Sequence, residues 1–299
     1  MTKGMKKSRW KDNLSGYLFI SPWLIGFLVF TLIPGAFCLF ISFTDWDMFT
    51  DYQIVGIQNY IDLFHDDLFL KSLWVTARFV VTSVGITIIL SLALALLLNI
   101  NSKAMYFFRT AFYIPSVVSG IAVALVWSWI FSPDFGVINY VLSLFGISGP
   151  DWLGNPAYAP WAFLIIMCTT FVGAPMVIFL AALQNVPPHL YESASLDGAG
   201  AFAKLFYITL PEIKPIIVFN LITTVIGAFR TFTQAQTLAG TDGNPGHSLL
   251  FMVMYLYKKG FNDMKMGYAS AIAWVFFIIV LVCTLVIMKF SNNNEDKGV

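Results

Sequence analysis

Six residues between Thr223 and Gln234 bring polar or small side chains into an otherwise apolar stretch. Their intervals of three, four and seven place them on one face of a helix. Uncharged donors and acceptors on such a face suit a hydroxyl-rich molecule such as a sugar, whose C–H faces pack on aromatic rings. We predict a substrate path formed by Thr223, Thr224, Gly227, Arg230, Thr231 and Gln234, with Thr170 and Phe171 from a preceding stretch.

The same pattern allows other interpretations. Small and hydroxyl side chains also mediate contacts between helices in lipid. Arg230 can extend toward water, or it can pair with an acidic group on a uronate or a phosphorylated polyol. The choice between a neutral and an acidic cargo stays open at this point.

Several kinds of chemistry are disfavoured by what the sequence lacks. No Asp or Glu falls inside an apolar stretch, which counts against a proton-coupled or sodium-coupled secondary transporter. No GxxxxGK[ST] loop is present, so ATP-driven work requires separate ATPase chains. His65, His189 and His247 fall on separate loops, and the three cysteines form no metal-binding spacing. We expect no enzyme activity and no cofactor bound by this chain.

The chain is predicted to be an all-α polytopic membrane protein. It is 58% hydrophobic and only 11% charged, far from the composition of soluble domains. Pro34, Pro115 and Pro175 fall inside apolar stretches and are expected to kink them. Six stretches reach the length of about 20 residues that spans a bilayer: Tyr17–Phe43, Leu73–Ile100, Phe107–Phe131, Ala159–Leu183, Ile216–Leu238 and Tyr268–Phe290.

The distribution of basic residues predicts the orientation. With both termini inside, the inner segments hold eleven Lys and Arg residues against four outside, where Lys71, Lys258, Lys259 and Lys265 run against the trend. We therefore expect cytoplasmic tails at residues 1–14 and 291–299 around a membrane domain at 15–290. A net charge of +1 argues against a nucleic-acid partner.

A polar segment on the cytoplasmic side, at about residues 185–212, links the fourth and fifth predicted spans. Pro187 and Pro188 suit the start of a helix, which we expect to run to about Asp197. Gly198-Ala199-Gly200 then predicts a turn, followed by a second short helix at 201–207. The segment is either a lever that transmits motion or an amphipathic loop on the lipid surface.

This segment resembles the EAA motif of binding-protein-dependent ABC importer permeases. The order Glu-x-Ala-x-x-Asp-Gly-Ala-Gly and then Phe-x-Ile-x-Leu-Pro is present, although Ser193 replaces the usual alanine. Two further motifs resemble the carbohydrate-uptake permeases of the maltose and glycerol-phosphate type, in particular their first permease: Val55-Gly56-Ile57-Gln58-Asn59-Tyr60, and Gly243-Asn244-Pro245-Gly246 where Gly-Gly-Pro is usual.

The resemblance implies a type I ABC importer permease fold of six transmembrane helices in a bacterial cytoplasmic membrane. It implies that ATP and Mg are bound by two copies of a cytoplasmic ATPase subunit. The other implied partners are a second permease and an extracellular sugar-binding protein, with homodimerisation as the competing assembly. The outer loop at about 132–160, with Asp151 and Trp152, is either a contact for the binding protein or a lid without specific contacts. The implied ATPase-coupling residues are Glu192, Ala194, Asp197, Gly198, Ala199, Gly200, Leu210 and Pro211.

Overall fold

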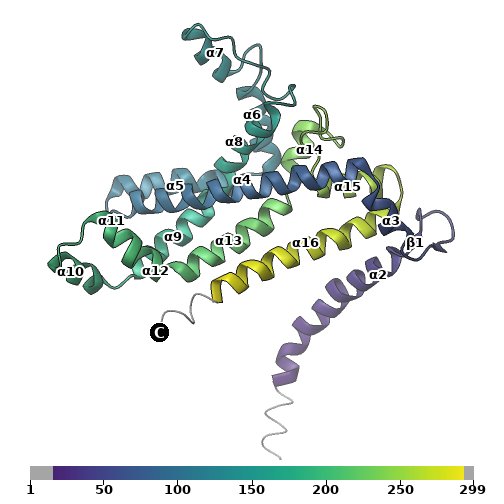
Figure 1. Cartoon of the computed structure of the whole chain (residues 1–299), viewed down its shortest axis with the longest axis horizontal. Coiled ribbons are helices and arrows are strands. Elements are labelled where there is room, and N and C mark those ends of the chain that lie inside the picture. The colour runs from purple at the N-terminus through teal and green to yellow at the C-terminus, as the bar shows by residue number, and fades with distance from the viewer. Residues whose placement is uncertain (1–15, 293–299) are drawn as a thin grey trace, which may run out of the picture. The chain divides into compact units, whose positions relative to one another are not determined.

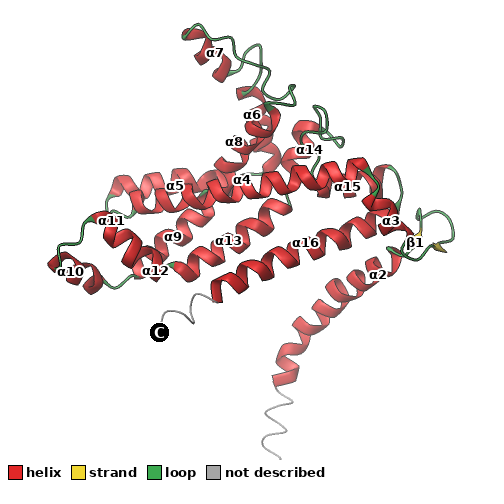
Figure 2. Cartoon of the chain, viewed as in Figure 1, coloured by secondary structure: helices red, strands yellow, loops and turns green. Residues whose placement is uncertain are grey.

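The computed structural model describes residues 16–292, which are predominantly helical (Figure 2). The expected tail at 1–14 and residues 293–299 of the other tail lie outside the described part. The chain divides into two compact units, one of residues 1–63 with 259–274, the other of residues 64–258 with 275–299. The second boundary falls within the last helix, α16 (Met266–Asn292).

The first unit contains a long helix and a small hairpin. The helix runs over Gly16–Ile41 and includes η1, a π-helical turn at Leu28–Leu32, and α2 (Ile33–Ile41). Pro34 lies at the start of α2, directly after the π-helical turn. The antiparallel strands β1 (Thr44–Asp45) and β2 (Gln53–Ile54) follow, and then α3 (Gln58–Phe64). The π-helical η3 (Lys258–Asn262) begins at the last residue of the second unit.

The Gly-Ile-Gln-Asn-Tyr motif holds this hairpin in place. The buried Asn59 side chain donates hydrogen bonds to the carbonyl oxygens of Ser42 and Thr44, at 2.9 and 2.8 Å. The Tyr60 hydroxyl lies 2.7 Å from the Ser42 hydroxyl. Gly267 approaches so closely that a Cβ atom there would collide with the Thr44 carbonyl oxygen. The motif therefore has a structural role in the hairpin.

The second unit is a bundle around α4 (Asp67–Leu98). The other elements of this unit are α5 (Lys103–Val117), α6 (Gly120–Ile130), α7 (Val137–Leu144), α8 (Ala159–Phe171), α9 (Gly173–Asn185), α10 (Pro188–Leu196), α11 (Ala201–Lys204), η2 (Leu205–Thr209), α12 (Leu210–Glu212), α13 (Lys214–Phe229), α14 (Thr233–Ala239) and α15 (Met252–Tyr257). α10, α11 and α12 lie at one end of this bundle, and α14 and α15 lie at the other (Figure 1).

The predicted number of membrane spans agrees with the helices. Within residues 16–292, four helices are long and apolar enough to cross a membrane: Gly16–Ile41, Asp67–Leu98, Lys214–Ala239 and Met266–Ser291. Two further helix pairs qualify as bent spans, α5 with α6 at 103° and α8 with α9 at 44°. Counting each bent pair as one span gives six.

The third predicted span, Phe107–Phe131, is not a single kinked helix. Pro115 lies inside α5, and the sharp bend comes after it, where Val118 and Ser119 are extended. At the start of α6, a Cβ atom on Gly120 would lie 2.6 Å from the Gln234 side chain of α14. The bend between α5 and α6 thus coincides with close packing of α6 against α14. Pro115 alone does not determine where the bend lies.

The fourth span bends at Val172, one turn before Pro175, as the proline predicts. Proline lacks the N–H group that would bond to the carbonyl four residues earlier, that of Phe171. The next carbonyl, of Val172, accepts the Met176 N–H at 3.1 Å and a further hydrogen bond of 3.0 Å from Ser91 of α4. Gly173 allows α5 to approach, since a Cβ atom there would lie 2.6 Å from the Phe112 carbonyl oxygen. Neighbouring helices thus stabilise the bend, as apolar surroundings require.

Candidate functional site

The polar segment between the fourth and fifth spans folds as predicted into two short helices with a glycine turn. α10 ends at Leu196, and Gly198 follows with φ of +80°, a conformation that disfavours residues with a Cβ atom. The Gly198 N–H bonds to the Ser195 carbonyl at 3.1 Å, and the Ala199 N–H bonds to the Ala194 carbonyl at 2.8 Å. This pair of bonds is a Schellman motif, which closes the helix end. The predicted second helix is α11 continued by the π-helical η2.

Side-chain contacts brace the two halves of this segment, which we call the coupling loop (residues 185–212). Lys204 Nζ of α11 donates to the Ser195 hydroxyl of α10 at 2.7 Å. The Tyr191 hydroxyl lies 2.9 Å from the Thr209 hydroxyl of η2. Leu190, Tyr191 and Ile208 also pack on a buried cluster at this end of the bundle. That cluster contains Ala95, Leu98, Met176, Phe179, Leu180, Leu183, Val186 and Ile213.

The cluster joins the coupling loop to three spanning helices, because its members come from α4, α9 and the start of α13. A close-packed interior transmits displacement instead of absorbing it. Movement of α10 is therefore expected to move the ends of these helices. This geometry is what a lever requires.

The coupling loop exposes a set of large apolar side chains together with two carboxylates. Leu196 is 90% exposed and Tyr207 is 83% exposed, although both lie on well-formed helices. Exposed apolar patches of this kind mark sites of contact with another protein or with a membrane. The predicted coupling residues Glu192 and Asp197 are also exposed on α10 and at its end. Leu210 and Pro211 begin α12.

A cavity of about 390 Å³ lies among the spanning helices and brings together five of the eight predicted path residues. Thr170 and Phe171 of α8 face Thr223, Thr224 and Gly227 of α13 across it. The rest of its lining is also uncharged. The other lining residues are Ser116, Ala174, Pro175, Ile178, Phe219 and Asn220.

Asn220 is a polar residue of this cavity that the sequence analysis missed. Its side chain is fully buried, and neither its Nδ2 nor its Oδ1 atom has a hydrogen-bond partner within residues 16–292. An unpaired buried amide costs about 1–3 kcal/mol. The spacing to Thr223 and Thr224, three and four residues, is the signal that could have found it. Asn220 therefore lines the cavity with an amide that is covered in this structure, and a molecule in the cavity reaches its donor and acceptor only when neighbouring side chains move.

The other three predicted path residues do not line the cavity, which corrects the prediction of one continuous helical face. α13 ends at Phe229, and the chain leaves helical geometry before α14 begins at Thr233. Arg230 is exposed at this break, whereas Thr231 is buried and its hydroxyl has no hydrogen-bond partner in the part of the chain that the structure describes. Gln234 lies against Gly120 of α6. The sequence period did not reveal the break because the polar positions keep their helical spacing through it.

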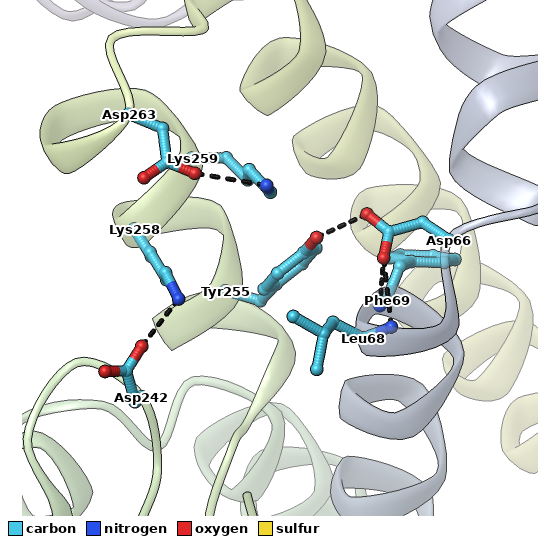
Figure 3. Close-up of polar contacts among 8 residues, drawn as sticks. All are labelled: Asp66, Leu68, Phe69, Asp242, Tyr255, Lys258, Lys259 and Asp263. Atoms are coloured by element: carbon cyan, nitrogen blue, oxygen red, sulfur yellow. Dashed lines mark hydrogen bonds and ion pairs between the residues drawn. The ribbon is translucent and has the colours of Figure 1, made fainter.

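At the opposite end of the second unit, polar contacts organise the segments between helices (Figure 3). Lys258 Nζ pairs with Asp242 Oδ1 at 2.5 Å, and this lysine lowers the pKa of the Asp242 carboxyl group. The Tyr255 hydroxyl of α15 bonds to the Asp66 carboxylate, which also caps the N-terminus of α4. In the first unit, Lys259 pairs with Asp263 at 3.1 Å. Two of the lysines that oppose the charge trend are therefore neutralised by local carboxylates.

The loop at 132–160 contains α7, and its Trp152 is engaged within the loop. The indole N–H donates to Asn139 Oδ1 at 2.7 Å, and the ring packs against Phe131 and Tyr158. Trp152 therefore stabilises the loop itself. Asp151 accepts a hydrogen bond from the Gly154 N–H and remains exposed. Within residues 16–292, no group of three His, Cys, Asp or Glu residues is placed to hold a metal ion.

Bent spanning helices, an uncharged and open cavity between them, and a braced loop at one end define a membrane transport protein. Comparison with known families agrees, because residues 85–294 match the family described as binding-protein-dependent transport system inner membrane component. The chain belongs to this family.

Relatives and solved structures resemble the chain over almost its full length. It is 44% identical to the probable ABC transporter permease protein YesP of Bacillus subtilis, over 96% of this chain and 94% of the relative. It is 33% identical to the arabinooligosaccharides transport system permease protein AraP of the same species, over 98% and 95%. The lactose transport system permease protein LacF of Rhizobium radiobacter is also 33% identical, over 95% and 96%.

Among solved structures, a chain of a bacterial alginate ABC transporter, crystallised with a periplasmic protein that holds an alginate pentasaccharide, has a TM-score of 0.80. It is 25% identical and is matched over 96% of this chain and 95% of that chain. The all-α permease fold expected from the sequence is confirmed.

Proposed function

We propose that this chain is a permease subunit of an ATP-driven importer and that it carries a sugar or oligosaccharide across the membrane. The observation that supports this most directly is the uncharged cavity. Thr170, Thr223 and Asn220 offer hydroxyl and amide groups there, and Phe171 and Phe219 offer rings. This combination suits neutral sugars, which present hydroxyl groups and apolar C–H faces. Relatives named for arabinooligosaccharides and lactose point to the same class of cargo.

An acidic cargo receives less support from the cavity, although the related alginate transporter imports an acidic polysaccharide. No Lys, Arg or His lines the cavity, and Arg230 lies outside it. A carboxylate that lost part of its hydration there would find no cationic partner to offset the loss. We therefore assign neutral sugars to this cavity. Replacing Arg230 by Gln is expected to leave neutral-sugar uptake within about twofold, since an exposed side chain outside the cavity contributes little.

The coupling loop is the proposed contact with a cytoplasmic ATPase. Its exposed apolar side chains would enter a cleft on that subunit, and Glu192 and Asp197 would make polar contacts at the edge. The hydrogen bonds between α10 and the α11–η2 helix, together with the buried cluster, would transmit movement of α10 to α4, α9 and α13. Two ATPase copies, bearing ATP and Mg, a second permease and an extracellular sugar-binding protein complete the proposed importer. Both termini and the coupling loop then face the cytoplasm.

The test of this function is the complete importer in proteoliposomes, with a panel of neutral and acidic sugars and the binding protein supplied outside. The proposal expects a neutral sugar or oligosaccharide to stimulate ATP hydrolysis and to accumulate inside. Asn220→Leu and Thr223→Val are each expected to reduce uptake about fivefold to thirtyfold without loss of assembly, because each removes a polar contact worth about 1–2 kcal/mol to the cargo. Stimulation by acidic sugars alone would contradict the cargo assignment.

A further inference from the structure

A second cavity, of about 170 Å³, lies far along α4 from the coupling loop. Unlike the uncharged cavity, it is lined by two basic side chains. We call it the basic pocket and define it by Lys71, Trp74, Arg78, Trp161 and Ser248. The first three share one face of α4, at intervals of three and four residues. Its floor is apolar. The rings of Phe79, Phe163 and Phe251 form this floor, with centroids 5.1 to 5.4 Å apart.

The basic pocket lacks any negative charge to balance its two cations. No Asp or Glu lines it, and within residues 16–292 neither Lys71 nor Arg78 forms an ion pair. The Arg78 guanidinium lies 5.3 Å from the centre of the Trp161 ring, which holds it in place without neutralising it. The Ser248 hydroxyl is buried and has no partner among the described residues. These groups together favour a bound anion with several oxygen acceptors.

The length of α4 sets the depth of the basic pocket in the bilayer. Leu98 ends the helix at the level of the coupling loop, where its carbonyl accepts two hydrogen bonds from Arg109. Arg78 lies twenty residues earlier, about 30 Å along the helix, which equals the thickness of the hydrocarbon core. Lys71 lies about 10 Å further out, in the headgroup layer. The 66% exposure of Trp74 suits this interfacial level.

We infer that the basic pocket binds the phosphodiester group of an anionic glycerophospholipid in the leaflet opposite the coupling loop. Arg78 would bind two phosphate oxygens in its planar fork, and Lys71 would add a second positive charge. Trp74 and Trp161 would flank the glycerol. The basic pocket shares no lining residue with the uncharged cavity, so the lipid site is separate from the proposed sugar site.

Native mass spectrometry of the purified importer tests this inference, with dioleoylphosphatidylglycerol and dioleoylphosphatidylcholine added separately. The wild-type complex is expected to retain phosphatidylglycerol preferentially. The double variant Lys71→Gln/Arg78→Gln is expected to bind it about thirtyfold more weakly, with phosphatidylcholine unchanged. Arg78→Lys keeps the charge and loses the fork, so an intermediate loss is expected. Lys265→Gln, a loop lysine outside the basic pocket, is the matched control and should behave as wild type.

Equal retention of phosphatidylglycerol by the wild type and the double variant would overturn the inference. So would an equal loss of both lipids, which would indicate a general defect. A third contrary result is unchanged lipid binding combined with a fall in the uptake of acidic saccharides, which would make the basic pocket a cargo site. Arg78→Lys keeps the experiment decisive if the double variant fails to assemble.

Discussion

Replacing Gly198 by valine tests whether the backbone geometry of the coupling loop is needed to couple ATP hydrolysis to transport. Gly198 has φ of +80°, and a Cβ atom added there would meet no atom within 4 Å. The cost of a side chain is therefore conformational, about 1–2 kcal/mol for an ordinary L-residue and more for a β-branched one. That energy would lower the equilibrium constant for forming the Schellman turn by about fivefold to thirtyfold.

The assay is uptake per ATP hydrolysed in proteoliposomes that contain the whole importer. Valine is expected to lower this ratio by a similar factor, while assembly and membrane insertion stay normal because the turn is exposed. Asparagine, which tolerates positive φ, is the matched control and should stay within about twofold of wild type. The reasoning would be refuted if valine transported normally, or if asparagine lost as much activity as valine.

Three further predictions concern stability and the polar sites. Asn220→Leu removes an unpaired buried amide, so thermal stability in detergent should hold or rise by up to about 1–3 kcal/mol even as uptake falls; a marked fall in stability would show that Asn220 has a structural partner. Gly267→Ala should lower stability by about 1–3 kcal/mol because its Cβ atom would collide with the Thr44 carbonyl oxygen, and an unchanged melting temperature would contradict this packing. Lys258 lowers the pKa of Asp242, so the pair stabilises the fold above the unfolded pKa of about 3.9 and loses this effect as pH falls through the folded pKa. The difference in melting temperature between wild type and Asp242→Asn should therefore be small at pH 6 and should vanish once the pH has fallen through the folded pKa, and a difference that grows in acid would contradict this.

Hydropathy and turn chemistry predicted much of this fold. Apolar length located the spans, since a bilayer requires about 20 apolar residues whatever their packing. Gly198 indicated a turn in the sequence because few other residues adopt positive φ. The breaks at Val118 and after Phe229 were not predictable, because they depend on contacts between helices distant in sequence, such as α6 with α14.

The candidate sites were predictable only in part. Thr170 and Thr223 meet across one cavity as expected, because both lie on apolar helices with a polar face. Asn220 was missed because its significance lies in the absence of a partner, which only the folded arrangement reveals. Arg78 was missed because a search for intramembrane carboxylates does not find an isolated cation near the end of a span. Both residues are polar groups in otherwise apolar helices, and both deserve the same scrutiny as an acidic residue there.

The central claim is that this chain passes a sugar through the membrane using energy from a partner ATPase. The most direct measurement is accumulation of labelled oligosaccharide in proteoliposomes that contain the complete importer, with ATP inside and the binding protein outside. We expect accumulation that requires both ATP and the binding protein and that stops when the partner ATPase is made inactive. Equal accumulation without ATP, or accumulation driven by a proton or sodium gradient, would contradict it.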